Sequence, residues 1–443
     1  MKGHRRRRLH KNLGLLRSDA AAWAIMAGAG ESYFVAFALA SGLSQVEAAL
    51  VATVPVVLGA ALHAITPWGA RWVGSLKWWV VGAAALQSAS LAALATLDWL
   101  GGLNATAIYS LITLYWAAGF ATAPPWQAWA PTLVPRRIAT HFWARRNRIV
   151  QGGLCLGLLG GLLLAWGQER GLLMTAFAAL LAIAAVARAA STVLLANHGE
   201  PQRDLARSVE LPSLPMLKRD FSDRTTRALL FYMLAVVFSV NVSGAFFTPY
   251  MLDVLHFSYA EFLAAMIVTF AARVLALPGV GRLAARFGPG VPLWMGGIGI
   301  VPMATLWTVS DSVWWILTLQ FVVGVTWACW ETATFLLIFD VIPAHRRTGL
   351  LTVYNLAHAS ATVVGSLVGA GMLRAVGVGR DGYTAVFIAT GLMRLMTLFL
   401  LAGIEPRRFR LKQSLDLYLE TLGIRFGGGT IELPHVAERR DGR

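Results

Sequence analysis

Long apolar stretches alternate with short polar segments along almost the whole chain. An α-helix needs about 20 mostly apolar residues to cross about 30 Å of hydrocarbon, because its backbone groups find no water there. Twelve stretches meet this requirement, six before and six after a polar segment at 197–226. We therefore predict twelve transmembrane helices, at 19–41, 46–67, 77–97, 104–125, 149–167, 171–195, 227–250, 259–280, 291–310, 313–338, 350–373 and 382–403.

Composition supports a membrane protein and argues against a soluble one. Of the 443 residues, 57% are hydrophobic and only 14% are charged, and the mean hydropathy is +0.61. An average soluble domain has about 45–50% apolar and about 25% charged residues, so this chain has too little charge for a water-facing surface. The two cysteines, Cys155 and Cys329, lie in apolar stretches, which predicts free thiols and no disulfide framework.

The distribution of basic residues predicts the orientation. The net charge is +16, yet all but six of the 38 lysines and arginines fall on one side of the predicted helices. By the positive-inside rule, that side is the cytoplasm and both termini lie there. The basic excess therefore reflects membrane orientation, and we expect no nucleic-acid partner. The arginines of the loop after the fourth span are expected to meet anionic lipid headgroups.

The two groups of six spans carry matching residues. Pro135, Asn147, Gly157 and Gly161 recur 208 positions later as Pro343, Asn355, Gly365 and Gly369. Two Ser-x-x-Glu capping boxes, at 44–47 and 258–261, match with an offset of 214, and Arg188 matches Arg394 with an offset of 206. These matches predict a parallel internal repeat.

Twelve spans, a polar central segment and two parallel halves resemble the major facilitator superfamily. Its loop signature is visible after the eighth span as Gly281, Arg286 and Gly288, with Ala285 in place of the family's Asp. The resemblance implies an all-α protein of two six-helix bundles and assigns these three residues to a cytoplasmic gate. The expected organisation is a basic tail (1–18), an N-terminal bundle (19–196), a linker (197–226), a C-terminal bundle (227–403) and a C-terminal tail (404–443).

Only two carboxylates lie well inside predicted spans, Glu31 and Glu331. An ionised carboxylate is costly in hydrocarbon, so each should face a cavity, pair with a cation or carry a proton. In the resembled family, the spans that hold them line the central cavity. Both are therefore candidate proton carriers or contacts for a substrate cation; the alternative is a hydrogen-bonded structural acid.

Three further residues are assigned to the same cavity: Tyr115, Asn241 and Trp327. Each also has a plain structural interpretation, as a helix-packing residue or a polar contact between helices. Arg145 and Arg146 are assigned to a second gating loop, because loops after the fourth and tenth spans move in this family. Arg188, Arg273 and Arg394 are expected to be structural, with their long side chains reaching toward lipid phosphates or helix carbonyls.

No enzyme motif, metal-ligand spacing or nucleotide-binding loop is present in the sequence, so we expect no cofactor. The main hypothesis is a monomeric secondary active transporter of a small solute, with coupling to protons as its sharper form, in a bacterial inner membrane. Two alternatives remain open: a passive facilitator or exporter of lipid or hydrophobic compounds, and a non-transporting membrane receptor. A short amphipathic helix is also predicted at 411–426.

Overall fold

The computed structural model describes residues 2–63, 66–100, 102–199, 224–341 and 344–403, and these ranges are helical throughout, with short turns and no strand. The amphipathic helix predicted at 411–426 lies outside them. The α-helices are α1 (Lys2–Ala29), α2 (Phe34–Ala40), α3 (Gln45–Val51), α4 (Val54–His63), α5 (Thr66–Val73), α6 (Leu76–Trp99), α7 (Ala105–Trp129), α8 (Arg136–Leu158), α9 (Gly160–Glu169), α10 (Leu173–Ala196), α12 (Arg224–Gly244), α13 (Phe247–Pro249), α14 (Tyr259–Phe287), α15 (Gly290–Met303), α16 (Val313–Val341), α17 (Ala344–Val376) and α18 (Arg380–Ala402). Short 3-10 and π turns are η1 (Glu31–Tyr33), η2 (Ala130–Leu133), η4 (Tyr250–Val254) and η5 (Thr305–Thr308).

The prediction of a polytopic helical protein is confirmed. Within the described ranges, eleven helical segments are long and apolar enough to cross a membrane, and a twelfth, Gln45–Ala61, is apolar but shorter. This second span is divided into α3 and α4 around Ala52 and Thr53. Pro55 follows in the first turn of α4, where its missing N–H costs no helical hydrogen bond.

The first span has two features that the sequence did not predict. Its helix extends back into the basic segment 1–18, because α1 begins at Lys2. Toward its other end α1 stops at Ala29, and the chain turns through Gly30 into η1 before α2 begins. A Cβ at Gly30 would lie 3.1 Å from the carbonyl oxygen of Met26, so the small residue suits this tight break. The break places Glu31 at the centre of an interrupted helix.

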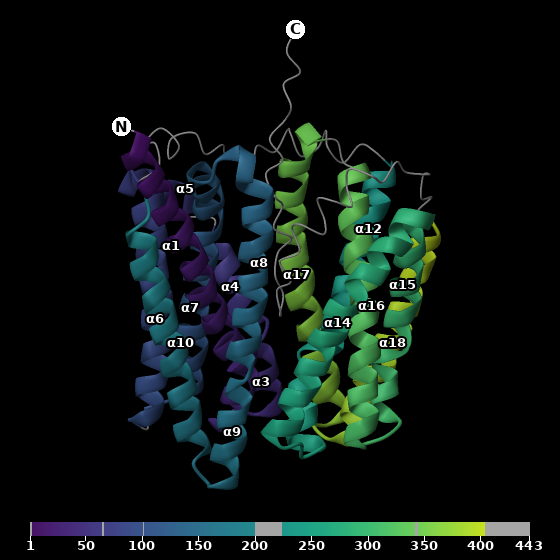
Figure 1. Cartoon of the computed structure of the whole chain (residues 1–443). Coiled ribbons are helices and arrows are strands. Elements are labelled where there is room, and N and C mark those ends of the chain that lie inside the picture. Colours follow the sequence, from purple (N-terminus) through teal and green to yellow (C-terminus); the bar gives the residue numbers. More distant parts are fainter. Residues whose placement is uncertain (1, 64–65, 101, 200–223, 342–343, 404–443) are drawn as a thin grey trace.

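The helices pack into two sets that follow one another along the chain. Figure 1 shows α1, α6, α7, α8 and α10 on one side and α12 with α14–α18 on the other. The start of α1 lies at the upper end in this view, whereas α3 and α9 lie toward the lower end. We call these the α1 end and the α9 end.

Repeat-related glycines perform the same packing task in both sets. Gly157 of α8 lies against α1, where an added Cβ would be 2.5 Å from the carbonyl oxygen of Ile25. Gly365 of α17 lies against α12, where an added Cβ would be 2.6 Å from the carbonyl oxygen of Phe238. Any larger residue would separate the backbones, so the matched glycines hold two equivalent helix crossings. Both predicted capping boxes are also confirmed, at Ser44/Glu47 and Ser258/Glu261.

Among the described residues, several contacts join the two sets at the α9 end. Ser366 of α17 donates to Thr53 Oγ1 (2.8 Å), and Tyr383 of α18 donates to Gln45 Oε1 (2.9 Å). The largest hydrophobic cluster also draws buried side chains from both sets, among them Tyr33 and Phe262, whose rings meet edge to face. Buried apolar area and hydrogen bonds therefore close the molecule at this end. We call these contacts the inter-half seam.

Candidate functional site

Glu31 and Tyr115, predicted independently for one cavity, are in direct contact. The Tyr115 hydroxyl, carried by α7, donates a hydrogen bond of 2.7 Å to Oε1 of Glu31. It also lies 2.9 Å from the sulfur of Met26 in α1. Tyr115 is completely buried and Glu31 is half-buried. The break after α1 thus turns the carboxylate toward a phenolic donor on a neighbouring helix.

Glu331 pairs with an arginine that the sequence analysis assigned elsewhere. Nη2 of Arg273 in α14 lies 3.2 Å from Oε1 of Glu331 in α16. The Glu331 side chain is 40% exposed, whereas that of Arg273 is 11% exposed. The partner of Arg273 is therefore a carboxylate on a neighbouring helix, which the sequence did not predict. It supplies the cation for a carboxylate that remains accessible on one side.

The other two predicted cavity residues make contacts within their own regions. The Asn241 amide donates to the carbonyl oxygen of Val237 in the same helix, at 2.8 Å. Trp327 packs edge to face on Trp330, with 5.4 Å between ring centroids, and lines a cavity in the C-terminal set. None of the contacts above joins Glu31 and Tyr115 to Glu331.

Asp19 is a functional candidate that the sequence analysis missed. Its Oδ1 accepts a hydrogen bond of 2.7 Å from Ser191, and the Ser191 hydroxyl accepts one of 2.9 Å from Arg188. Arg146 of α8 approaches the other carboxylate oxygen at 3.9 Å and stacks over Trp126. The available signal was Arg188 itself, since an arginine inside a span requires a partner.

The predicted gating residues lie toward the α1 end of the helices. Arg146 belongs to the network around Asp19, whereas Arg145 is exposed. Gly281 is buried in α14, and Arg286 is exposed, with its guanidinium over the ring of Phe287. Gly288 ends α14 with φ of +88° and ψ of 161°, a conformation that is essentially restricted to glycine. Glycine in the signature loop is thus required locally to stop the helix.

Arg188 and Arg394 are held inside the helix sets, and Arg394 meets a helix carbonyl, one of the two kinds of partner expected for these side chains. They are 3% and 4% exposed, respectively. Arg394 donates to the carbonyl oxygen of Ile300 and to the hydroxyl of Ser243, both at 3.1 Å. The Arg394 guanidinium therefore forms its hydrogen bonds inside the bundle.

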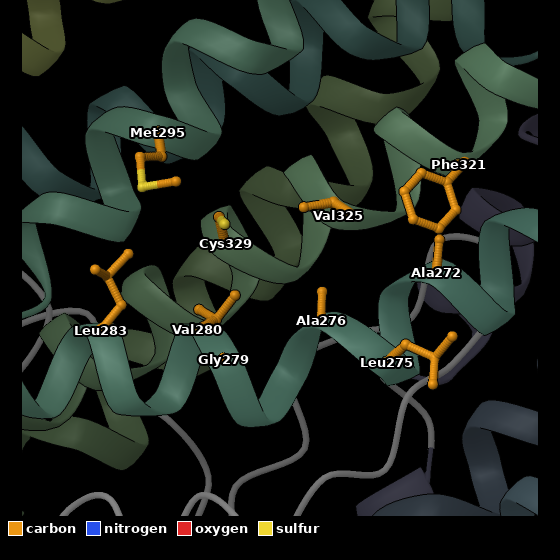
Figure 2. Close-up of a pocket in the computed structure, with 10 residues that line it drawn as sticks. All are labelled: Ala272, Leu275, Ala276, Gly279, Val280, Leu283, Met295, Phe321, Val325 and Cys329. Atoms are coloured by element: carbon orange, nitrogen blue, oxygen red, sulfur yellow. The ribbon is translucent and has the colours of Figure 1, made fainter.

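A groove of about 340 Å³ lies between α14, α15 and α16 (Figure 2). Its lining residues are apolar apart from the thiol of Cys329, and Leu275, Met295 and Phe321 are exposed at its edge. Without a hydrogen-bonding partner for a polar solute, this surface is chemically suited to an acyl chain or another apolar molecule.

In the part of the chain that the structure describes, an all-helical architecture with eleven long apolar helices in two packed sets is that of a polytopic membrane protein. Charged groups held between its helices are typical of transporters. Residues 149–366 and 229–415 match the family model of the Major Facilitator Superfamily. Together these matches cover more than half of the chain, and the chain belongs to this superfamily.

Solved structures with low sequence identity share the fold. The nucleoside transporter NupG is 10% identical with a TM-score of 0.66, over 90% of this chain and 100% of that chain. A bacterial homologue of the iron transporter ferroportin is 17% identical in two states. Its inward-facing structure gives a TM-score of 0.65, covering 90% of this chain and 98% of that one. Its outward-facing structure with soaked iron gives 0.54, covering 90% and 99%. No curated protein sequence matches this chain.

Proposed function

We propose that this protein is a secondary active transporter that moves a small solute by alternating access, with protons as the coupling ion. The observation that carries the proposal is that each helix set holds a partly exposed carboxylate inside a span, Glu31 or Glu331, in contact with a hydrogen-bond donor or a cation. Tyr115 donates to Glu31, and Arg273 pairs with Glu331. Protonation of either carboxylate would weaken its contact, so proton binding can alter the local packing of helices.

The inter-half seam supports alternating access. The two sets are joined at the α9 end by the Ser366–Thr53 and Tyr383–Gln45 hydrogen bonds. With both termini in the cytoplasm of a bacterial cell and the chain in the inner membrane, as we propose, this end is the periplasmic one. The structure then corresponds to an inward-facing state, and the higher TM-score to the inward-facing ferroportin homologue agrees with that assignment. Opening the seam while closing the α1 end would expose the site to the other side.

We further propose that the protein acts as a monomer whose basic loops at the α1 end contact anionic lipids. Arg145 and Arg148 are exposed on the first part of α8, as this role requires. The residues around Gly288 and Arg146 are proposed to move during the transition, because both lie where α14 and α8 pass the α1 end. The similar structures are described as transporters of different solutes, so they favour no particular substrate for this chain.

The experiment begins with a thermal-shift screen of small solutes on purified protein, followed by flux measurements in liposomes containing a pH-sensitive dye. Proton-coupled transport predicts a solute-dependent change in internal pH that is lost in the double variant Glu31→Gln, Glu331→Gln. Glu47→Gln is the matched control, because Glu47 is a helix-capping carboxylate at the α9 end. Full coupled transport by the double variant would refute proton carriage by these residues.

A second candidate function is the movement of a lipid or another hydrophobic compound down its gradient. The apolar groove between α14, α15 and α16 favours it. Flux of a fluorescent lipid that continues without a pH gradient and is unchanged in the double variant would support this function over the first. Solute-induced stabilisation without any flux would instead indicate a receptor.

A further inference from the structure

A second cavity, of about 230 Å³, lies inside the C-terminal set of helices, away from the groove of Figure 2. Its walls come from α12, α15, α16 and α18, from α13 at Phe247 and from η5 at Trp307. Most of the lining is apolar or aromatic, and one group is a cation, Arg394. The lining residues are Val240, Gly244, Phe247, Ile300, Met303, Trp307, Gln320, Val323, Thr326, Trp327 and Arg394.

Arg394 is a buried cation without a matching anion. Its side chain is 4% exposed, and the two groups that it contacts, the Ile300 carbonyl and the Ser243 hydroxyl, are both neutral. Its Nε–H has no acceptor. Among the described residues, no carboxylate lies within the 4 Å of an ion pair to this guanidinium. One donor and one full charge therefore remain uncompensated at the wall of the cavity.

The repeat-related arginine of the other set shows what compensation looks like. Arg188 donates to Ser191, which donates to the carboxylate of Asp19, so a negative charge lies two hydrogen bonds away. The residue of α18 that corresponds to Ser191 is Thr397, and its hydroxyl is turned to the carbonyl oxygen of Arg394 in its own helix. The C-terminal set thus contains Arg394, the equivalent of Arg188, but Thr397 does not link it to a carboxylate as Ser191 links Arg188 to Asp19.

An uncompensated guanidinium in a medium of low dielectric constant is costly, and the cost is offset when an anion with good hydrogen-bond geometry joins it. Guanidinium binds a carboxylate well because its planar donors match the two oxygens. The rest of the cavity would face the non-polar part of such a ligand, with Phe247, Trp307 and Trp327 as aromatic surfaces. A cavity of about 150 Å³ is enough to hold benzene, so 230 Å³ accommodates one ring with its acid group.

We propose that this cavity binds an organic monoanion, a carboxylate attached to a single ring or a short apolar chain. The carboxylate accepts hydrogen bonds from Arg394, including the one that its Nε–H now lacks, and the apolar part packs against Trp307 and Trp327. Binding of this ligand does not depend on transport. That the same anion is the transported solute rests on the proposed function.

Sodium benzoate serves as the probe, with benzamide as its neutral analogue and sodium chloride as the inorganic anion at equal ionic strength. Added to the purified full-length protein, benzoate should raise the thermal unfolding midpoint in a saturable manner, because a ligand that binds only the folded state stabilises it. Benzamide and chloride should produce no saturable shift. No shift with benzoate, or an equal shift with benzamide or chloride, would overturn the proposal.

Two variants test the site itself. Arg394→Met should abolish the benzoate shift, whereas Arg282→Met, an exposed arginine of α14, should leave it unchanged. Because Arg394→Met could prevent folding, Gly244→Leu provides an independent test that leaves the arginine in place. The nearest atom to a Cβ at Gly244 is Asn241 Oδ1 at 3.7 Å, so a side chain can begin there without a clash, and we expect the leucine to occupy cavity space. Gly371→Leu, on an exposed face of α17, is its matched control.

The benzoate shift should be lost in Gly244→Leu and retained in Gly371→Leu. If both Gly244→Leu and Arg394→Met retain the benzoate shift, the cavity is not the binding site. If Arg394→Met does not fold, a shift retained in Gly244→Leu leads to the same conclusion. Liposome flux of benzoate is measured separately. Binding of benzoate without flux would support the binding site and exclude benzoate as the transported solute. Coupled flux of another solute would support the proposed transport function and would not test the binding site.

Discussion

The hydroxyl of Tyr115 donates a hydrogen bond of 2.7 Å to Oε1 of Glu31, at the point where the first transmembrane span is interrupted. The two residues are separated by 84 positions in the chain and belong to different helices. The contact ties the ionisation of a carboxylate to the packing of α7 against η1. Protonation of Glu31 would therefore change how α7 packs against η1, as the proposed proton coupling requires.

Tyr115→Phe should impair transport with the carboxylate still present. A hydrogen bond to a charged group contributes about 1.5–3 kcal/mol, and its loss should reduce coupled flux roughly tenfold or more if this arrangement is required.

Glu31→Gln should abolish proton-coupled flux but retain solute exchange across liposomes, because exchange requires no net proton movement. The measurement compares counterflow and coupled uptake for both variants. Wild-type coupled uptake by Tyr115→Phe would show that the contact has no role in coupling.

The Arg273–Glu331 pair should show energetic coupling. Arg273→Gln leaves the carboxylate without its cation, and breaking a buried pair costs about 3–5 kcal/mol. Because the Glu331 side chain is 40% exposed, solvent screening reduces the expected loss of stability to about 1–2 kcal/mol. The double variant Arg273→Gln, Glu331→Gln should recover part of that loss. Thermal unfolding of the two single variants and the double variant forms the cycle, with Arg282→Gln on the same helix as control; strictly additive losses would contradict the pairing.

The inter-half seam should be lockable with a disulfide. The side-chain oxygens of Thr53 and Ser366 lie 2.8 Å apart, so cysteines at both positions would bring their sulfur atoms near one another, and we expect them to form a disulfide. Both native cysteines are free, and they are replaced by alanine in the background used for this test. Oxidation of Thr53→Cys, Ser366→Cys should stop transport, and a reductant should restore it. Unchanged transport by the fully cross-linked protein would show that the seam does not open in the cycle.

His198 should make the protein sensitive to acid. Its ring is buried against Trp129, and desolvation lowers its pKa below the ordinary value of 6.5, although the charge of Asp19 opposes this effect. In the unfolded chain the same imidazole takes up its proton near pH 6.5, so the unfolded state binds more protons below that pH. The free energy of unfolding should therefore fall as pH decreases from about 7 through 6.5 and toward the lowered pKa.

The corresponding measurement follows the thermal midpoint of wild type and His198→Phe between pH 7.5 and about pH 5. The variant retains an aromatic ring on Trp129 and cannot be protonated, so its midpoint should decline less with acid. His10→Asn, at an exposed position of α1, should behave like wild type. Parallel pH profiles for wild type and His198→Phe would assign the acid sensitivity to other groups.

Periodic and compositional signals predicted the spans, because a membrane-crossing helix must satisfy its backbone internally and therefore leaves a long apolar run in the sequence. The same local logic predicted the two capping boxes, which depend on residues only three positions apart. It did not predict the interruption at Gly30 or the helical conformation of the first basic residues from Lys2. Apolar length by itself contains no information on such breaks.

Candidate residues were found where burial of charge was visible from sequence, as for Glu31, Glu331 and the three intramembrane arginines. Their partners could not be found in that way. Arg273 lies 58 positions from Glu331, and Asp19 is separated from Ser191 by 172 positions. The sequence left open whether each arginine reaches the lipid phosphates or a helix carbonyl, because it does not show which helices are neighbours. In the structure, groups on the same or a neighbouring helix accept the hydrogen bonds of Arg188 and Arg394.

The sequence by itself determined that this chain is a polytopic helical membrane protein, that two carboxylates lie well inside its predicted spans, and that its halves repeat. These properties depend on local composition and on spacing along the chain. Only the tertiary structure decided that Tyr115 donates a hydrogen bond to Glu31, that Arg273 forms an ion pair with Glu331, and that Arg394 lies beside a cavity with no carboxylate among the described residues within ion-pair distance. Those relationships arise from the crossing of helices distant in sequence, where close packing at glycines such as Gly157 and Gly365 determines which side chains can reach one another.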